Sequence, residues 1–372
     1  MKVLLLAGEE SGILYAEQIR AEILRRHPEA EIRGYGEYGF KTADLAVMGF
    51  LAVLRKLFYF LRVKRTLERA IVDWRPDVVC TVDYPGLNLK LAAFAKARGV
   101  RAVHVVCPQV WAWKKGRIPK IEAALDRLCC FFPFEPQYFR SGFAEFVGHP
   151  LAEAMRGGGV GGGVGGGKVL ALLPGSRIGE IERNFPVMLE VVKRLTETSH
   201  ASHASHASHA SHIQVVVPTA NEQAFRVISA SIERGVVDHA DVRVQLGGAR
   251  EVLRRADAAV VASGTATLEA ALAGCPTVLV YRVGAVFYYL AKHLIKGIRH
   301  IGLANIIAEK AGVAAPMPEL IQADFTPAKV LAHLRPWLTD PVANAAARES
   351  LRRTMAHLAS SGSAIARIVD QL

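Results

Sequence analysis

Short apolar runs that take turns with helix-like stretches constrain this chain more than any other feature. The runs are residues 2–7, 77–82, 102–106, 128–132, 169–173, 213–217, 258–262 and 277–281. They are rich in Val, Leu and Ile without polar alternation, which is typical of strands buried on both faces of a parallel sheet. The helix-like stretches are residues 13–26, 52–73, 89–97, 181–196, 220–233, 249–256 and 267–273. The alternation predicts an α/β protein with doubly wound parallel sheets.

A glycine tract, "RGGGVGGGVGGGK", predicts where the chain divides. Because 372 residues exceed the usual size of one core, we expect two domains. These are residues 1–155 and 168–340, joined by a flexible linker at 156–167. We expect the segment after residue 340 (341–372) to be mostly helical and to pack back on the first domain.

A second low-complexity segment, "SHASHASHASHASH" at residues 199–212, lies before the apolar run at 213–217. Its histidines are of a kind that binds Zn²⁺ or Ni²⁺, but no carboxylate or thiolate accompanies them. We interpret the segment as a loop insert and predict no metal site.

The charge balance narrows the class of partner. A net charge of +12 favours nucleic acid, an anionic membrane or a phosphorylated substrate. Nucleic acid is not expected, because no motif that binds DNA or RNA is present. Five cysteines, an odd number without metal-ligand spacing, indicate reduced core thiols of a cytoplasmic protein. The opening "MKVLLLAGEESG" is typical of a first strand rather than a signal peptide, and no apolar run is long enough to span a bilayer.

Two strand–turn–helix junctions indicate a phosphate site. In "LLPGSRIGEIERN" an apolar run ends before Ser176 and Arg177, and in "VVASGTATLE" another ends at residues 263–265. A helix N-terminus presents unpaired N–H groups to an anion, and an arginine fits phosphate oxygens. An ordinary turn with an N-cap serine is the alternative for either junction alone. Two junctions in one domain favour a diphosphate. Glu269, in the first turn of the second helix, either only favours the helix dipole or accepts both hydroxyls of a ribose.

"TVDYPGLN" places Asp83 directly after the run at 77–82. This is the carboxyl edge of the predicted sheet, where open α/β proteins bind ligands. By position alone Asp83 is either an N-cap or a general base. His149 in "GHP" is the rival base, although we interpret it as an interdomain packing or substrate-orienting residue. His104 lies inside an apolar run and is expected in the core.

The motifs now form an ordered set. "AGEESG", "PDVVCTVDYPGLNLKLA", "PQVWAWKKGRIPKI", "PFEPQYF", "FVGHPLAE", "LLPGSRIGEI", "SGTATLE" and "LANIIA" follow one another along nearly the whole chain. This set resembles the GT-B glycosyltransferases and, more narrowly, the lipid-A-disaccharide synthase family. The resemblance implies two Rossmann-like domains with an interdomain cleft. It also implies inverting transfer of the sugar of UDP-2,3-diacylglucosamine to 2,3-diacylglucosamine 1-phosphate. The products would be a β-1,6 disaccharide 1-phosphate and UDP, made without a metal or cofactor.

The resemblance also assigns residues. It makes Asp83 the catalytic base. It places the UDP-sugar contacts at Ser176, Arg177, Ser263, Gly264, Thr265, Glu269, Asn305 and Gln322. It places substrate or loop roles at Glu9, Ser11, Gly12, Asn88, Trp111 and His149. It implies a peripheral protein on the cytoplasmic face of the inner membrane, and it allows a homodimer.

"FLAVLRKLFYFLRVKRTLERAIVDW" at residues 50–74 predicts a basic amphipathic helix. The residues expected to meet the membrane are Phe50, Leu51, Leu54, Leu57, Phe58 and Leu61. An ordinary core helix is the alternative, but apolar residues all round favour a membrane or an acyl chain. Trp111, Trp113 and Lys114 form a second basic-aromatic cluster, predicted either to meet acyl chains or the acceptor phosphate, or to be a surface turn with buried tryptophans.

One departure keeps other functions open. Ile13 stands where the resembled family usually has an aspartate. The alternatives are a transferase that makes a lipid-linked peptidoglycan precursor, a UDP-GlcNAc 2-epimerase, or a non-catalytic protein that binds lipid or nucleotide.

Overall fold

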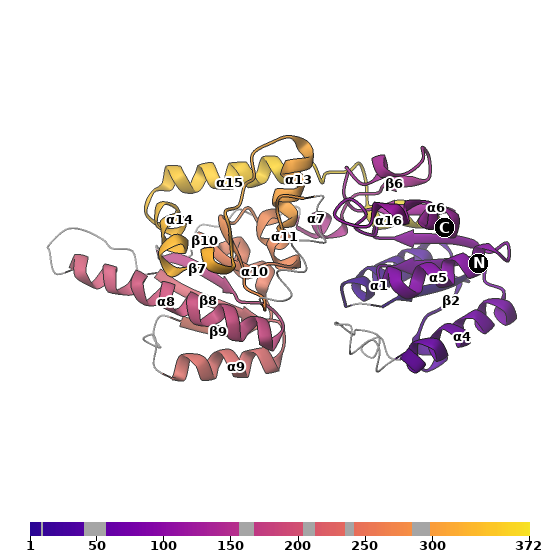
Figure 1. Ribbon diagram of the computed structural model, residues 1–372, viewed down its shortest axis with the longest axis horizontal. Helices are drawn as coiled ribbons and strands as arrows, with labels where there is room; N and C mark the ends of the chain where they lie inside the picture. Colours follow the sequence, from indigo (N-terminus) through magenta and orange to yellow (C-terminus); the bar gives the residue numbers. More distant parts are fainter. Residues whose placement is uncertain (9, 41–56, 156–166, 204–212, 235–241, 285–297) are drawn as a thin grey trace. The chain divides into compact units, whose positions relative to one another are not determined.

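The computed structural model describes residues 1–8, 10–40, 57–155, 167–203, 213–234, 242–284 and 298–372. The chain forms two compact units (Figure 1). The N-terminal unit contains Met1–Ala154 and Leu358–Leu372, and the C-terminal unit contains Met155–His357. The predicted glycine linker lies outside the described residues apart from Gly167.

The N-terminal unit is built on a parallel sheet with the strand order β2-β1-β3-β4-β5-β6. Its strands are β1 (Lys2–Ala7), β2 (Glu31–Arg33), β3 (Val78–Val82), β4 (Arg101–Val105), β5 (Arg127–Cys130) and β6 (Ala144–Phe146). Its helices are α1 (Glu10–Arg26), α4 (Leu57–Trp74), α5 (Pro85–Lys96), α6 (Ile118–Ala124), α7 (Pro150–Met155) and α16 (Ala364–Val369). The last residue of α7, Met155, is the first residue of the C-terminal unit. Helices α1 and α16 cover one face, and α4, α5 and α6 cover the other.

The strand order of this sheet reverses between β1 and β3. From β1 the chain moves outward to β2, and it then returns to build β3 to β6 on the other side. The loops that follow β1 and β3 therefore leave the carboxyl edge next to each other. In open α/β sheets this is the place where ligands bind.

The C-terminal unit repeats this plan with the order β12-β11-β10-β7-β8-β9. Its strands are β7 (Lys168–Leu173), β8 (Ile213–Thr219), β9 (Val242–Leu246), β10 (Ala258–Ala262), β11 (Thr277–Tyr281) and β12 (Glu319–Ile321). Its helices are α8 (Ile178–His203), α9 (Glu222–Glu233), α10 (Ala249–Arg255), α11 (Thr265–Leu272), α13 (Leu303–Ala311), α14 (Pro327–Thr339) and α15 (Pro341–Ala356). The reversal lies between β7 and β10.

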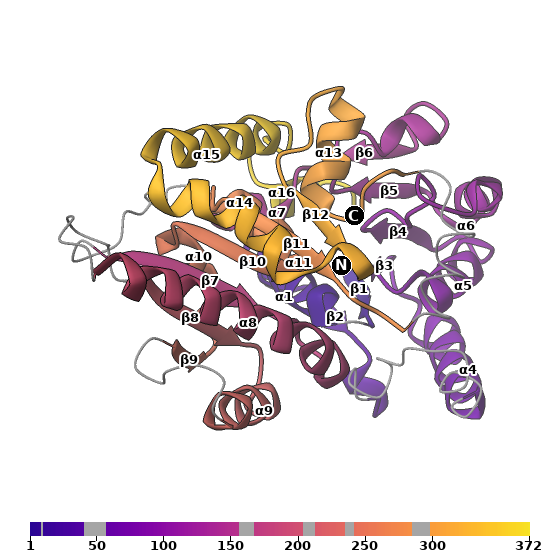
Figure 2. The same cartoon turned by 60° about the vertical axis from the view of Figure 1, so that its left-hand side comes forward.

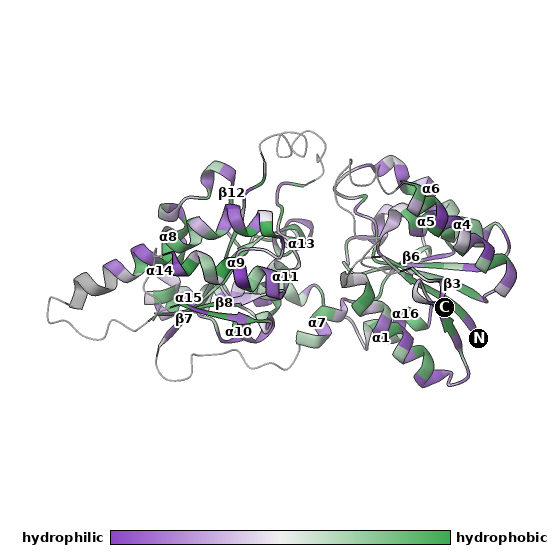
Figure 3. Ribbon diagram, turned by 90° about the horizontal axis from the view of Figure 1, so that it is seen from below, coloured by the Kyte–Doolittle hydropathy of each residue, from purple (hydrophilic) through white to green (hydrophobic). Residues whose placement is uncertain are grey.

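Helices cover both faces of this second sheet. Helices α8, α9 and α14 share a hydrophobic core with its strands, and in Figure 2 α8 and α14 cross the near face. Helices α10 and α11 pack on the opposite face. Figure 3 shows hydrophobic residues along the strands and hydrophilic residues on the outer sides of the helices. The predicted doubly wound α/β class is therefore confirmed in both units.

All eight predicted strands are present, with ends shifted by no more than two residues. The prediction missed β2, β6, β9 and β12, which are the two edge strands of each sheet. An edge strand is short and only half covered, so its sequence need not be a continuous apolar run. The burial of β9, in which no residue is fully buried, illustrates this.

Two predictions about loops and the C-terminus need correction. Helix α8 continues to His203, so the low-complexity segment begins as helix, and its remainder lies outside the described residues. The C-terminal segment does not pack on the first domain as a whole: α15 belongs to the C-terminal unit, and only Leu358–Leu372 belongs to the N-terminal one.

The prediction of reduced core thiols is confirmed, because all five cysteines are free and buried. No helix within the described ranges combines the length and the apolar character needed to cross a bilayer.

Candidate functional site

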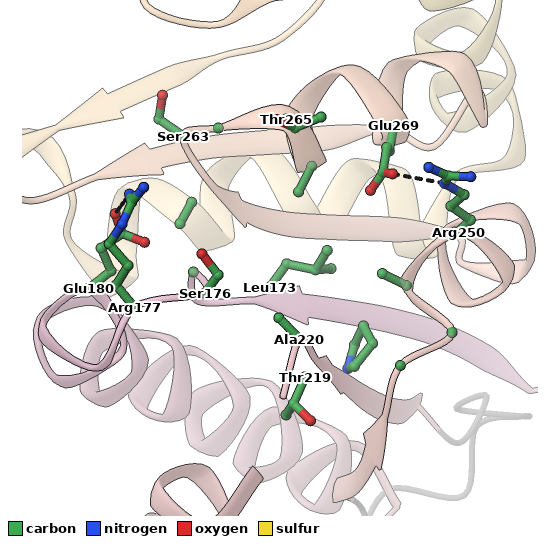
Figure 4. A pocket seen from close by; sticks show the side chains of 18 residues that line it. Leu173, Ser176, Arg177, Glu180, Thr219, Ala220, Arg250, Ser263, Thr265 and Glu269 are labelled. Carbon is green, nitrogen blue, oxygen red and sulfur yellow. Dashed lines mark hydrogen bonds and ion pairs between the residues drawn. The ribbon is translucent and has the colours of Figure 1, made fainter. Parts of the chain in front are cut away.

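A cavity of about 550 Å³ opens at the carboxyl edge of the second sheet, where the strand order reverses (Figure 4). Its polar and charged lining residues are Ser176, Arg177, Glu180, Thr219, Arg250, Ser263, Thr265 and Glu269. The loops that follow β7, β8, β9 and β10 all contribute to it. The two junctions that the sequence pointed to thus lie on either side of one pocket, which we call the nucleotide pocket.

The β7–α8 loop is built around a close approach that only glycine permits. Gly175 has a φ of +122°, and a Cβ there would lie 2.7 Å from Oε2 of Glu180. Glu180 in turn accepts a hydrogen bond from Nη1 of Arg177 at 2.9 Å. The turn therefore holds Arg177, an exposed cation, beside the N-terminus of α8. A cation and a helix N-terminus together favour an anion.

The β10–α11 loop faces it across the pocket. Gly264 has φ +156° and ψ −165°, a backbone conformation that is essentially restricted to glycine. The hydroxyl of Thr267 donates to the Gly264 carbonyl oxygen at 2.8 Å and fixes the turn. Ser263 and Thr265 lie at the start of α11 with their side chains shown in Figure 4.

Sequence reasoning missed Arg250. Its Nε donates to Oε1 of Glu269 at 2.8 Å, and both residues line the nucleotide pocket. Arg250 lies in the first turn of α10 after Gly247 and Gly248. The "LGGAR" stretch is itself a strand–turn–helix junction. It was not recognised as one because the sequence of β9, "VRVQL", is not a continuous apolar run.

Asn305 and Gln322, predicted as UDP-sugar contacts, do not line this pocket. Asn305 is fully buried; its amide donates to Met317 and Glu319 and accepts from the Met317 N–H. We therefore assign it a structural role. Gln322 follows the edge strand β12 with a left-handed φ of +54°, and its side chain donates to the Val283 carbonyl oxygen at 3.1 Å.

Asp83 directly follows β3, at the reversal point of the first sheet. Asp83 and Tyr84 have φ values of +53° and +51°, which for residues other than glycine cost about 1–3 kcal/mol each. Oδ1 of Asp83 accepts the Tyr84 N–H at 2.8 Å. Burial raises the pKa of the Asp83 carboxyl, and this hydrogen bond opposes the rise in part. A strained, half-buried carboxyl at a ligand-binding edge fits a proton acceptor.

The residue directly after β1, Gly8, permits a close approach to the Asp83 turn. A Cβ on Gly8 would lie 2.6 Å from the Tyr84 ring, and one on Gly12 would lie 3.6 Å from the Asp83 Cβ. Gly12 lies in α1, and a Cβ added there would make only ordinary van der Waals contact with Asp83. Ser11 lies in α1, its side chain undescribed, and Glu9 is outside the described residues.

Asn88 supports the Asp83 turn from beneath. Its fully buried amide donates to the carbonyl oxygens of Leu6, Val82 and Asp83. Its Oδ1 accepts the Tyr35 hydroxyl at 2.7 Å. Asn88 thus ties the ends of β1 and β3 to the Asp83 turn, which places it as a loop-positioning residue rather than a substrate ligand.

The side chain of Trp111 fits the alternative of a surface turn with buried tryptophans better than a substrate contact. It is buried, and its indole N–H donates to Oε1 of Glu135 at 3.1 Å. Glu135, also buried, accepts the Phe132 N–H at 3.1 Å as well, and burial raises its pKa to about 8. Strand β5 ends at Cys130, two residues earlier than predicted. Trp113, by contrast, is exposed and has the Lys114 ammonium 4.2 Å from its ring centroid.

Within the described ranges, three potential metal ligands come together at Cys107, Cys130 and Glu135, with ligand atoms within 4.8 Å of one another. The Cys107 sulfur donates to the Pro108 carbonyl oxygen, and Glu135 is engaged by Trp111 and Phe132. The cluster is a buried hydrogen-bonded network rather than an open coordination site.

The two candidate histidines are both buried. Nδ1 of His149 accepts the Leu151 N–H at 3.1 Å, and its ring packs on Phe131 and Phe132. Burial lowers its pKa to about 4, which fits a structural residue at the start of α7. His104 lies in the core as predicted, with its pKa lowered to about 3.

Helix α4 combines the two interpretations offered for it. Val63, Leu67 and Ile71 pack in the core, so one face is an ordinary core face. Phe58 and Leu61 are exposed on the other side, and Phe58 is 83% exposed. The side chain of Leu57 is not described, and Phe50, Leu51 and Leu54 lie outside the described residues.

Comparisons with known proteins agree with this layout. The profile of the family described as Lipid-A-disaccharide synthetase matches residues 3–364. A lipid-A-disaccharide synthase of Syntrophus aciditrophicus is 37% identical over 383 residues, covering 97% of this chain and 94% of the relative. One of Neisseria gonorrhoeae is 35% identical over 357 residues, covering 90% and 86%.

Solved structures with low sequence identity share the fold. The glycotransferase of kitacinnamycin has a TM-score of 0.60 at 15% identity, covering 99% of this chain and 97% of that one. Acinetobacter baumannii MurG has a TM-score of 0.59 at 13% identity, covering 99% and 98%. On the family profile and the full-length relatives, this chain belongs to the lipid-A-disaccharide synthetase family, and it is a glycosyltransferase with the GT-B fold.

Proposed function

We propose that this chain transfers the sugar of UDP-2,3-diacylglucosamine to 2,3-diacylglucosamine 1-phosphate. The observation that carries the proposal is the nucleotide pocket, where Arg177 and two helix N-termini surround a cavity large enough for a nucleoside diphosphate. Membership of the family supports this choice of lipid substrates.

In this proposal the diphosphate lies between the starts of α8 and α11. Arg177 and the backbone N–H groups of these turns offset the charge that grows on the leaving UDP. Ser263 and Thr265 add hydroxyl donors, and Glu269 accepts ribose hydroxyls at the other end of the pocket. We expect the reaction to need no metal ion, because Arg177 and the helix termini supply the positive charge.

Asp83 acts as the general base. Its carboxylate takes the proton from the 6-hydroxyl of the acceptor as that oxygen forms a bond to the anomeric carbon of the donor. The bond between this carbon and the UDP phosphate oxygen breaks, and UDP leaves with its electron pair. The raised pKa of Asp83 makes its carboxylate a stronger base than an exposed aspartate.

Both substrates carry acyl chains, so the protein has to work at a membrane surface. We propose that the exposed side of α4 provides this contact, with Phe58 and Leu61 entering the interface. Arg62, Arg65 and Arg69, exposed on the same helix, meet anionic headgroups. This gives a peripheral protein on the cytoplasmic face of the inner membrane.

A product assay tests the proposal. The purified chain is mixed with both lipid substrates in detergent with EDTA, and the products are identified by mass spectrometry. We expect a tetraacyl disaccharide 1-phosphate and UDP, and no product from Asp83→Asn. UDP binding without product in the wild type would contradict the proposed reaction and favour a non-catalytic protein. Product that appears only when Mg²⁺ replaces EDTA would contradict metal independence alone.

A further inference from the structure

We propose that Arg250 is a positioning residue for nucleoside recognition: it fixes the Glu269 carboxylate for the ribose hydroxyls and closes that end of the nucleotide pocket. The inference rests on the proposed function only in taking the donor to be a nucleoside diphosphate sugar. Neither the family resemblance nor the sequence motifs assigned a role to Arg250.

The two ion pairs of the pocket differ in whether their partners come from one helix turn or from two helices. Arg177 and Glu180 are three residues apart at the start of α8, so one turn supplies both partners. Arg250 and Glu269 lie on different helices, α10 and α11, 19 residues apart. Figure 4 shows the Arg177 pair at one end of the pocket and the Arg250 pair at the other. The second pair therefore connects two walls of the cavity.

The loop before α10 is shaped to deliver this arginine. Gly247 and Gly248 have φ values of +71° and +73°, a left-handed pair that side chains rarely adopt. They turn the chain from β9 directly into α10, whose second residue is Arg250. Because the turn is tight, Arg250 lies at the pocket edge instead of on the outer side of the helix.

The chemistry of the pair leaves room for a ligand. The bond uses Nε of Arg250 and Oε1 of Glu269. A carboxylate has about four lone-pair positions, so it still accepts hydrogen bonds from two neighbouring hydroxyls, which a ribose provides. The arginine restricts the rotamers of Glu269, which lowers the entropy lost when the ribose binds.

The degree of exposure sets the expected size of the effect. The side chain of Arg250 is 42% exposed and that of Glu269 is 15% exposed. A charge-assisted bond at the edge of water contributes less than a buried one, so we expect Arg250→Ala to weaken UDP binding by about threefold to tenfold. The turnover number, which depends on Asp83 and the leaving diphosphate, should change much less than the KM for the donor.

The first experiment measures binding of UDP and of 2′-deoxy-UDP to the full chain by calorimetry. The variants are Arg250→Ala and, as a matched control on the same helix, Arg255→Ala, whose partner is the exposed Glu251 outside the pocket. We expect wild type and Arg255→Ala to prefer UDP, and Arg250→Ala to lose much of this preference. An unchanged preference in Arg250→Ala, with an unchanged melting temperature, would overturn the inference.

A double-mutant cycle with Glu269→Ala distinguishes positioning from independent contact. If Arg250 acts through Glu269, the two substitutions together weaken UDP binding no more than Glu269→Ala alone. Additive effects would overturn the positioning role. Arg250→Lys should restore part of the affinity because it keeps one charged donor.

These readouts do not depend on the lipid substrates. If the wild type binds UDP but makes no disaccharide, the proposed function fails while the Arg250 inference is still judged by the binding data. If UDP does not bind to the wild type at all, both are contradicted.

Discussion

The side-chain amide of Asn88 donates a hydrogen bond to the carbonyl oxygen of Asp83 at 2.8 Å, and so supports a left-handed residue from within the core. The same amide also holds the ends of two strands. The proposed base is therefore oriented by a residue that is itself fully buried.

Replacing Asn88 with alanine tests this relationship. The change leaves several buried carbonyl oxygens and the Tyr35 hydroxyl without their partner, so we expect a loss of about 3 kcal/mol in the free energy of unfolding. The turnover number should fall, because Asp83 loses its support. Asn221→Ala is the matched control: it removes the N-cap of α9 and costs about 1 kcal/mol without affecting turnover. Equal turnover in both variants would contradict a positioning role for Asn88.

The pKa of Asp83 predicts a pH dependence. Burial raises this pKa above its ordinary value of 3.8. The base must be ionised, so kcat/KM should fall as the pH decreases through an acid limb whose midpoint lies above 3.8. Asp83→Asn should lower kcat by about a hundredfold to ten-thousandfold and remove this limb, while UDP binding stays intact. Retention of the same acid limb in the variant would assign it to another group.

Gly8 and Gly86 give opposite predictions for the same substitution. Gly8→Ala places a methyl group 2.6 Å from the Tyr84 ring, which should cost about 1–3 kcal/mol and displace the Asp83 turn. Gly86 lies in α5, and a Cβ added there would have no neighbouring atom within 4 Å, so Gly86→Ala should stabilise the protein by about 0.5–1 kcal/mol. Urea unfolding measures both. A stabilised Gly8→Ala would show that the close approach to Tyr84 is not required.

Glu135 predicts a stability that depends on pH. Its pKa is raised from 4.5 to about 8, so the folded state holds a proton that the unfolded state releases in this range. The contribution of Glu135 to stability is therefore present in full below pH 4.5 and decreases as the pH rises toward 8. The unfolding free energy of wild type minus that of Glu135→Gln should fall across this window. A difference that stays constant would contradict the raised pKa.

Membrane contact through α4 is tested by placing a charge on its exposed side. Phe58→Glu should weaken binding to vesicles that contain anionic phospholipid by about tenfold, because a buried phenyl ring is lost and a negative charge is added. Val342→Glu is the control, since Val342 is 77% exposed on α15 in the other unit. Co-sedimentation measures both proteins. An equal loss in the two variants would indicate nonspecific binding.

The sequence by itself determined the interior of both sheets and the turns that end their central strands. A strand covered on both faces must be apolar along its whole length. This requirement concerns only the strand's own residues, so β1, β3, β7 and β10 could be predicted from their apolar runs. Their ends place Asp83, Ser176 and Ser263 at the carboxyl edges. These positions follow from chain direction in a parallel sheet and need no knowledge of distant partners.

Only the tertiary structure decided what depends on segments far apart in the sequence. Each edge strand pairs with only one neighbouring strand and need not be apolar along its length. For this reason none of the four edge strands was predicted. Trp111 is buried and donates a hydrogen bond to Glu135, 24 residues away in the sequence. Arg250 contacts Glu269 because helices α10 and α11 pack side by side. The exposure of a side chain and the identity of its partner are set by what packs against it, and that information is absent from the local sequence.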